Sequence, residues 1–161
     1  AFHQLYESAP IELKKKLILH IIGDGTQKNA LIAWVTAHQL ASHVRFLGWQ
    51  DNVGQWMNQW KIFALSSLWE GLPCAIIEAR LHKLPVVAYD SGGIAEVVKD
   101  QLNGALIQPG NWQQLAQELQ ALVMHENKYR RLADFNDQLE CFTYKSMRTE
   151  HKKLYRDLMH P

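Results

Sequence analysis

The sequence predicts a single α/β domain in which a mostly parallel β-sheet is flanked by helices. Short apolar runs typical of buried strands alternate with longer segments of helical periodicity, and turn residues separate them. The 161 residues suffice for one domain, and the 47% of hydrophobic and 20% of charged residues are typical of a globular chain. Strands and helices that alternate through short loops require parallel strands, because each helix returns the chain to the same end of the sheet.

The predicted strands are apolar runs that end at glycine, proline or polar residues, as strands buried on both faces of a sheet do. In chain order they cover residues 17–22, 44–47, 61–65, 84–89 and 104–107. Gly23 and Gly48 end the first two strands, and the pair Ser66-Ser67 ends the third. Parallel sheets bind ligands at the carboxyl ends of their strands, so we expect a site at these turns or at residues 90–93.

The predicted helices fill the intervals between the strands. In chain order they cover residues 28–41, 53–60 and 73–83, a short segment that ends at Val98, a segment that begins after Asn111, and residues 128–140 and 144–159. Pro73 suits a first helical turn because it lacks an N–H group, and Asn111 suits an N-cap. The chain begins without Met and already in a helix-like pattern, so we expect it to be part of a longer protein.

Charge and motif patterns argue against several classes of function. The 17 Lys and Arg nearly balance 16 Asp and Glu, whereas nucleic-acid binders usually carry a basic excess. No apolar run reaches the 18 or more residues of a membrane span. The pair Gly23 and Gly25 follows a strand, but Lys28 stands where a dinucleotide-binding fingerprint needs its third glycine. Cys74 and Cys141 fit no metal or redox spacing, and we expect no metal, no cofactor and a reduced, cytoplasmic chain.

The strongest constellation is a pair of glutamates separated by seven residues, Glu70 in a loop and Glu78 in the helix that follows. Between them, backbone N–H groups gather at a helix N-terminus, which favours an anion such as a diphosphate; they belong to Gly71, Leu72, Cys74 and Ala75. Glu78 stands among apolar residues, where an ionised carboxylate needs a hydrogen-bond partner such as a ribose diol. Alternatively, Glu78 pairs with Arg80, His82 or Lys83, and Glu70 is an acid at a helix start.

Several segments in order resemble the C-terminal half of glycosyltransferase family 4. The pair Glu70 and Glu78 matches the E-x7-E motif of that family. Further matching segments are residues 66–78 and 85–88, Gly92-Gly93-x-x-Glu96, Asn103-Gly104 and Pro109-Gly110, with residues 19–25 and 44–48 upstream and residues 142–144 and 154–155 near the end. The resemblance covers nearly the whole chain.

This resemblance implies a GT-B fold, in which two Rossmann-like domains face each other across a cleft. It implies transfer of a hexose-type sugar from a nucleotide-diphosphate donor with retention of configuration and without a metal. Glu70 matches the catalytic glutamate that contacts the donor sugar, and Glu78 matches the one that holds the ribose. The remaining donor-binding positions implied are the amides of Gly71, Leu72, Cys74 and Ala75 for sugar and diphosphate, Leu47 and Gly48 beside the base, and Gly23 and Gly25 at its rim.

The resemblance further implies that residues 1–161 form the C-terminal, nucleotide-sugar-binding domain. The N-terminal acceptor domain and the first strand of this domain, with a loop whose Arg and Lys bind the diphosphate, would then lie outside the chain. Pro73 departs from members that have a free N–H there. The last helix, residues 143–159, would return toward the acceptor domain. Its basic residues either face anionic lipid or form a solvated face; they are Arg148, Lys152, Lys153 and Arg156.

The habit of the family points to bacterial surface-polysaccharide synthesis on a glycan or lipid-linked acceptor, in the cytoplasm or at the inner face of the membrane. Two alternatives stay open, a nucleotide-sugar epimerase of the same fold and a non-catalytic scaffold domain. Four tryptophans near the expected site are either core residues or a platform for a sugar; they are Trp49, Trp56, Trp60 and Trp69.

Overall fold

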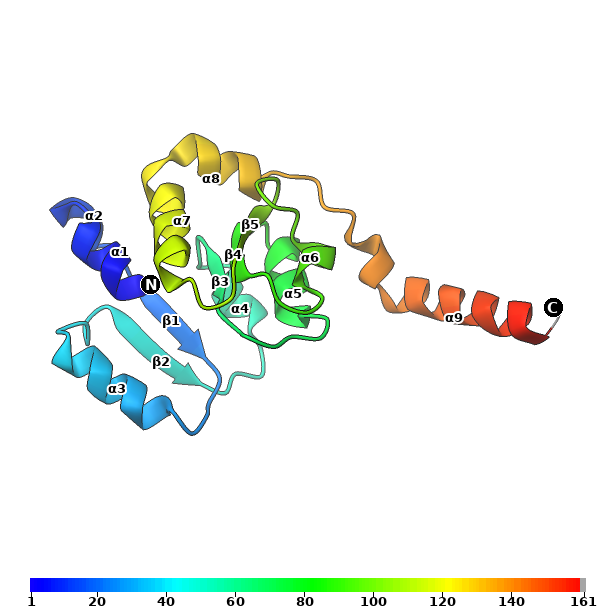
Figure 1. Cartoon of the computed structure of the whole chain (residues 1–161), viewed down its shortest axis with the longest axis horizontal. Coiled ribbons are helices and arrows are strands. Elements are labelled where there is room, and N and C mark those ends of the chain that lie inside the picture. Colours follow the sequence, from blue (N-terminus) through cyan, green and yellow to red (C-terminus); the bar gives the residue numbers. More distant parts are fainter. Residues whose placement is uncertain (160–161) are drawn as a thin grey trace.

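The computed structural model describes residues 1–159 and consists of parallel strands covered by helices (Figure 1). In chain order the elements are α1 (Phe2–Ser8), α2 (Ile11–Lys14), β1 (Leu19–Ile22), α3 (Lys28–Ala37), β2 (Val44–Gly48), α4 (Gly54–Met57), β3 (Phe63–Leu65), α5 (Cys74–Leu81), β4 (Val86–Tyr89), α6 (Ile94–Val97), β5 (Gly104–Ile107), α7 (Trp112–Met124), α8 (Glu126–Ala133), the 3-10 helix η1 (Leu139–Phe142) and α9 (Tyr144–Met159). The predicted alternation of strands and helices is confirmed.

The strands form two parallel sheets rather than one, a pair β1-β2 and a triplet β3-β4-β5. The central strand of the triplet is β4, and all four of its residues are buried. None of the four residues of β1 is fully buried, and Ala64 in the middle of β3 is exposed. The sheet is therefore interrupted between β1 and β3, which each have a neighbour on one side only.

Side-chain contacts join the two sheets across this seam. Ala1, the N-cap of α1, packs against the core of the triplet, whereas Phe2 and Tyr6 of α1 pack against the core around β1 and β2. Trp60, just before β3, donates its Nε1–H to Nδ1 of His20 in β1 at 3.0 Å. The two sheets are thus held together by helix α1 and by side chains, without a backbone ladder between them.

Protonation of His20 is expected to weaken this seam. Burial, and secondarily the nearby charge of Arg45, holds the pKa of His20 below its ordinary value. The unfolded chain therefore takes up this proton first as the pH falls, so the contribution to stability is complete above about pH 6.5 and decreases below it. His20→Asn keeps an acceptor for Trp60 but does not titrate. Urea unfolding should show that the free energy of unfolding decreases less between pH 7.5 and pH 5.5 in this variant than in the wild type. Equal decreases in the two proteins would contradict this role of His20.

Several predicted element ends are confirmed, and one predicted helix is too long. Strand β5 and helix α9 have the predicted bounds to within one residue, and the side chain of Asn111 caps α7 by accepting the backbone N–H of Gln114 at 3.0 Å. The helix predicted over residues 128–140 ends instead at Ala133. The carbonyl groups of Ala133, its last residue, and of Phe135 accept hydrogen bonds from Arg80 instead of from a further helical turn.

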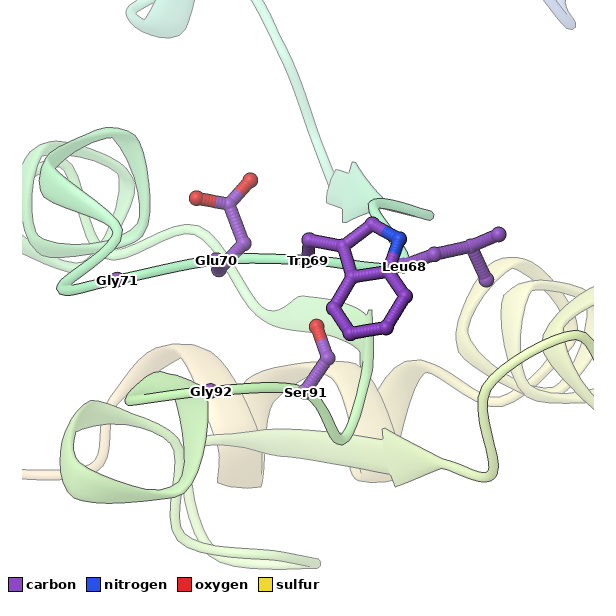
Figure 2. Close-up of a pocket in the computed structure, with 6 residues that line it drawn as sticks. All are labelled: Leu68, Trp69, Glu70, Gly71, Ser91 and Gly92. Atoms are coloured by element: carbon purple, nitrogen blue, oxygen red, sulfur yellow. The ribbon is translucent and has the colours of Figure 1, made fainter.

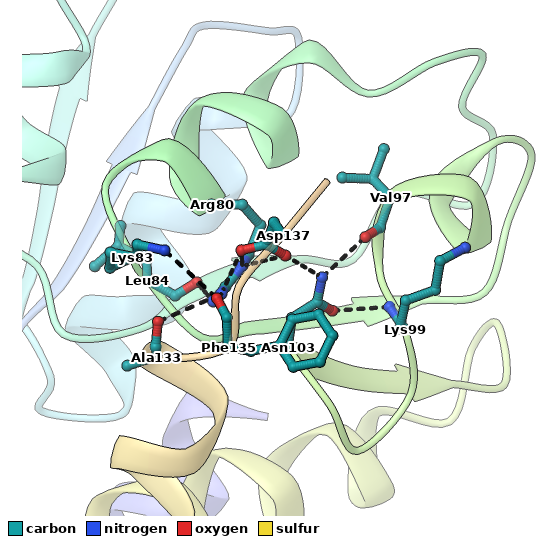
Figure 3. Close-up of polar contacts among 9 residues, drawn as sticks. All are labelled: Arg80, Lys83, Leu84, Val97, Lys99, Asn103, Ala133, Phe135 and Asp137. Atoms are coloured by element: carbon teal, nitrogen blue, oxygen red, sulfur yellow. Dashed lines mark hydrogen bonds and ion pairs between the residues drawn. The ribbon is translucent and has the colours of Figure 1, made fainter. Parts of the chain in front are cut away.

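A polar network surrounds this arginine, which is buried (Figure 3). The Arg80 guanidinium donates to both carboxylate oxygens of Asp137, with Nη2 to Oδ2 at 2.7 Å, and to the backbone carbonyls of Leu84, Ala133 and Phe135. Asn103 donates to Oδ1 of Asp137 at 2.6 Å. Arg80 therefore attaches the segment between α8 and η1 to helix α5.

Helix α9 extends away from the body of the domain, and none of its described residues is buried (Figure 1). Several of its exposed apolar side chains are three, four or seven residues apart, as on the apolar face of an amphipathic helix. They are Tyr144, Met147, Leu154, Tyr155 and Leu158. No helix within residues 1–159 combines the length and the apolar character that crossing a bilayer requires.

Candidate functional site

Glu70 lies in an open pocket between two loops that follow neighbouring strands (Figure 2). One loop, residues 66–73, follows β3 and is called the Glu70 loop below; the other follows β4. The cavity has a volume of about 610 Å³ and is lined by Leu68, Trp69, Glu70, Gly71, Ser91 and Gly92. Because β3 and β4 are parallel, the pocket lies at the carboxyl end of the sheet, where ligands of such sheets bind.

The N-terminus of helix α5 lies directly after the Glu70 loop. The helix begins at Cys74, so Pro73 is its N-cap rather than its first residue, one position from the prediction. The carbonyl of Pro73 accepts the N–H of Ile76 at 2.9 Å. Within residues 1–159, the exposed Cys74 and Ala75 have no acceptor for their backbone N–H groups, which suits an anion at this helix end.

Glu78 is exposed, so its apolar neighbours in the sequence do not take its carboxylate out of water, and the assumption that it needs a hydrogen-bond partner for that reason is wrong. It lines a second, smaller pocket of about 340 Å³ together with Asp51, Asn52, Val53, Gly54, Leu81 and His82. The apolar face of α5 turns Ile76, Ala79 and Arg80 inward instead. The buried charge of this helix is therefore Arg80 and not Glu78.

The alternative in which Glu78 pairs with a cation is not observed among residues 1–159. Arg80 binds Asp137, Nδ1 of His82 lies 2.8 Å from Oδ1 of Asn58, and Lys83 donates to the carbonyl of Phe135. The carboxylate of Glu78 makes no hydrogen bond or ion pair with these residues. It therefore faces the second pocket without a protein partner in the described part of the chain.

In the two-stranded sheet, the turns that follow β1 and β2 contact each other. The N–H of Gly23 donates to the carbonyl of Gly48 at 2.8 Å, and both glycines have positive φ angles, +108° and +66°. Asp24 accepts from the ammonium of Lys28 and the N–H of Gly25, both at 2.8 Å. The Lys28 hydrogen bond first, and then that of Gly25, lowers the pKa of Asp24, so this carboxylate stays ionised.

The structure distributes the predicted site residues over several places. Glu70 and Gly71 line the first pocket, and Glu78 lines the second. The amide groups of Cys74 and Ala75 lie between them along the chain, at the start of α5. Gly23, Gly25, Leu47, Gly48 and Leu72 line neither pocket, although the Gly23 and Gly48 turns are joined by a hydrogen bond.

Of the four tryptophans considered as a sugar platform, two are core-like and two are exposed. Trp56 donates to Gln50 and Trp60 donates to His20, and both are partly buried. Trp49 and Trp69 are 79% and 90% exposed. Trp69 lines the Glu70 pocket, so it alone of the four has the position that a platform requires.

Sequence reasoning named residues 90–93 as a possible ligand-binding turn but assigned no individual role to Ser91 or Gly92, which line the pocket together with Glu70. The segment stood out as a strand-to-helix turn, yet a turn alone does not reveal which loop it packs against. Residues 51–54 of the second pocket were also missed, because they carry no motif. Within residues 1–159, no three His, Cys, Asp or Glu side chains are grouped so that they could hold a metal ion.

Comparison with protein families gives one match to most of the chain. The model described as "Glycosyl transferases group 1" matches residues 1–138. The lipopolysaccharide core biosynthesis glycosyltransferase LpsE of Rhizobium meliloti is 29% identical over 133 residues, which are 83% of this chain and 38% of LpsE. A UDP-Gal:alpha-D-GlcNAc-diphosphoundecaprenol alpha-1,3-galactosyltransferase of Escherichia coli is 35% identical over 89 residues, 55% of this chain and 23% of that protein.

Among solved structures, HepE of Anabaena in complex with UDP-glucose is similar, with a TM-score of 0.79 and 25% identity over 99% of this chain and 44% of HepE. The chain spans between 23 and 38% of the length of eight curated relatives that it matches, LpsE and the galactosyltransferase among them. The similarity therefore covers one part of these longer proteins.

Proposed function

The chain belongs to the group 1 glycosyl transferases and has the Rossmann-like architecture of GT-B enzymes, and from this premise we propose that it is the donor-binding domain of a retaining, family 4 enzyme. The donor is a nucleotide-diphosphate sugar of the hexose type. The observation that carries the proposal is the placement of Glu70 in a pocket at the carboxyl ends of β3 and β4, next to the open N-terminus of α5. HepE, which is similar over 99% of this chain, was solved with UDP-glucose bound.

In this proposal the residues divide the donor between them. Glu70 contacts hydroxyl groups of the donor sugar in the first pocket, and Glu78 accepts hydrogen bonds from the ribose in the second. The free N–H groups of Cys74 and Ala75 point at the diphosphate between the two. Leu47 and Gly48 border the base, with Gly23 and Gly25 at its rim.

In the chemistry we propose, the bond between the sugar and the diphosphate oxygen breaks while an acceptor hydroxyl forms the new bond on the same face of the sugar. The proton of that hydroxyl passes to the departing diphosphate. Positive charge develops on the sugar ring and negative charge on the leaving oxygens. Glu70 stabilises the former, and the start of α5 stabilises the latter through its N–H groups and dipole. A metal ion has no part in this proposal, because the protein groups themselves oppose both charges.

The interrupted sheet supports the proposal that one strand of the domain lies outside residues 1–161. In β1, Leu19 donates to His43 and Gly23 to Gly48, so the alternate residues His20 and Ile22 direct their backbone groups toward β3. In β3, Phe63 donates to Pro85 of the β4 side, so Ala64 faces β1. A parallel strand between them would complete one sheet, and its following loop would approach the diphosphate.

Helix α9 is proposed to pack against the acceptor-binding domain. Its apolar side chains are exposed, and a second domain across the cleft would cover them. The relatives named above act in lipopolysaccharide or lipid-linked saccharide synthesis. We propose a glycan or lipid-linked acceptor of bacterial surface-polysaccharide synthesis, handled in the cytoplasm, with the basic residues of α9 as a point of contact with the inner face of the membrane.

Saturation-transfer NMR with UDP, GDP, ADP and their sugar conjugates tests the donor site. We expect signals on the ribose and on one base only. Glu78→Gln should weaken binding by about tenfold or more, because hydrogen bonds to a charged group contribute about 1.5–3 kcal/mol. Glu150→Gln, at an exposed glutamate of α9, is the control and should bind as the wild type does.

Retained ribose signals in Glu78→Gln would show that Glu78 does not hold the donor. No signal with any nucleotide, in this chain and in the longer protein that supplies the missing strand, would overturn the donor-site proposal and favour a scaffold domain. Transfer of sugar to an acceptor by that longer protein would exclude an epimerase.

A further inference from the structure

The Glu70 loop is held to the rest of the domain by one short turn. Within residues 1–159, residues 66–72 make two hydrogen bonds, and both come from the turn of residues 91–93, called the 91–93 turn below. The hydroxyl of Ser91 donates to the carbonyl of Ser67 at 3.0 Å, and the N–H of Gly93 donates to the carbonyl of Gly71 at 2.9 Å. The two bonds lie on either side of Glu70 in the sequence.

Between these two bonds, Gly92 lies directly against the peptide of Glu70 (Figure 2). A Cβ atom at Gly92 would lie 1.7 Å from the carbonyl oxygen of Glu70 and 2.7 Å from its carbonyl carbon. Gly92 also has a φ angle of +56°, which L side chains rarely adopt. At Gly93, a Cβ atom would lie 2.6 Å from the carbonyl oxygen of Gly71. Both glycines are therefore required for the two loops to touch.

The contact determines where the Glu70 carboxylate stands. Glu70 makes no side-chain hydrogen bond within residues 1–159, so its position depends on its backbone. That backbone rests on Gly92, and Ser91, which is buried, fixes the start of the loop. A movement of the 91–93 turn would therefore move Glu70 relative to the start of α5.

We infer that the 91–93 turn is the positioning element of the Glu70 loop and sets the orientation of the donor sugar over Glu70. This inference rests on the proposed function for its ligand, while the contact itself exists without one. Its residues act through Glu70 and are positioning residues. Since they face the first pocket and Glu78 lines the second, their loss should affect the sugar and spare the ribose.

Gly92→Ala with Gly110→Ala as its matched control tests the inference. Gly110 also has a positive φ angle, +83°, but a Cβ atom there would meet no atom within 4 Å. The two variants therefore share the backbone strain, and only Gly92→Ala pushes on Glu70. Ser91→Ala removes the hydroxyl without adding atoms, and it serves as the second variant should Gly92→Ala fail to fold.

Two readouts are needed, the amide resonances of residues 69–72 without ligand and the ratio of sugar-ring to ribose saturation transfer with UDP-glucose. We expect Gly92→Ala and Ser91→Ala to shift the loop resonances. In Gly92→Ala the ratio should fall about threefold or more, because small displacements of a positioned group strongly reduce its contacts. Gly110→Ala should keep the wild-type values of both.

A wild-type ratio in Gly92→Ala, or an equal fall in Gly110→Ala, would overturn the inference. A wild-type chain that transfers saturation to neither ribose nor sugar would count against the proposed function instead. In that case the amide resonances of residues 69–72 alone would test whether the 91–93 turn positions the Glu70 loop. Unshifted resonances in Gly92→Ala would overturn that part of the inference.

Discussion

Asp137→Asn is expected to destabilise the domain by about 3–5 kcal/mol, the usual consequence of removing one partner of a buried ion pair. The side chains of Arg80 and Asp137 are 0% and 4% exposed, so the arginine charge would remain buried without its counter-ion. The amide cannot substitute for the carboxylate, because both oxygens of Asp137 accept hydrogen bonds (Figure 3). Either orientation of the Asn amide directs its NH₂ group at a donor of Arg80 or Asn103.

Urea unfolding followed by circular dichroism measures this loss. Glu126→Gln is the matched control, since it removes the charge from another Arg–carboxylate pair, that of Arg130, whose side chains are 70% and 68% exposed. We expect no measurable change there, because exposed pairs contribute little. Equal stabilities of the Asp137 and Glu126 variants would show that the network of Arg80 is not a main support of the fold.

A longer protein that supplies the strand proposed between β1 and β3 is expected to slow hydrogen exchange at the seam by about 100-fold or more. The amides of His20, Ile22 and Ala64 face the gap between β1 and β3 and exchange as edge-strand amides do in residues 1–161. Pairing on both sides would make them central-strand amides, which open only with much of the domain. If α9 packs against the proposed acceptor-binding domain, its amides should also exchange more slowly in the longer protein.

The amide of Val87 in β4 is the internal control for that comparison. Its strand already has a neighbour on each side, so its exchange should be set by the stability of the triplet in both proteins. The exchange rates of His20, Ile22 and Ala64 are each divided by the rate of Val87 in the same protein. Equal ratios with and without the additional segment would refute the proposed strand between β1 and β3.

The fold class could be predicted closely because the information is local. The apolar runs around Val86–Tyr89 and Gly104–Ile107 are encoded in consecutive residues, and both form parallel strands. Asn111 caps α7 through a hydrogen bond three residues away. The prediction of a helix up to residue 140 was wrong because the end of that helix depends on a distant residue. Arg80 donates to the carbonyl of Ala133, which lies 53 residues later in the sequence.

Some features of the candidate site could likewise be predicted from the sequence, and others could not. The spacing of Glu70 and Glu78, and the helix start between them, follow from the sequence alone. The exposure of Glu78 does not follow from the sequence, because the face of a helix that turns inward depends on the elements that pack against it. In α5, the residues turned inward include Ile76 and Arg80. Periodicity over one short helix of mixed composition does not distinguish these faces.

By itself, then, the sequence determined the order and type of the elements and the pair of glutamates, because propensity, periodicity and capping act between residues within a few positions of one another. Only the tertiary structure decided that Gly92 touches the peptide of Glu70, that Arg80 is the buried charge, and that the sheet is interrupted between β1 and β3. Each of these depends on contacts between residues more than 20 positions apart, such as the Ser91–Ser67 hydrogen bond at a separation of 24. Such contacts arise only when the chain packs, because steric fit and desolvation are properties of the assembled interior.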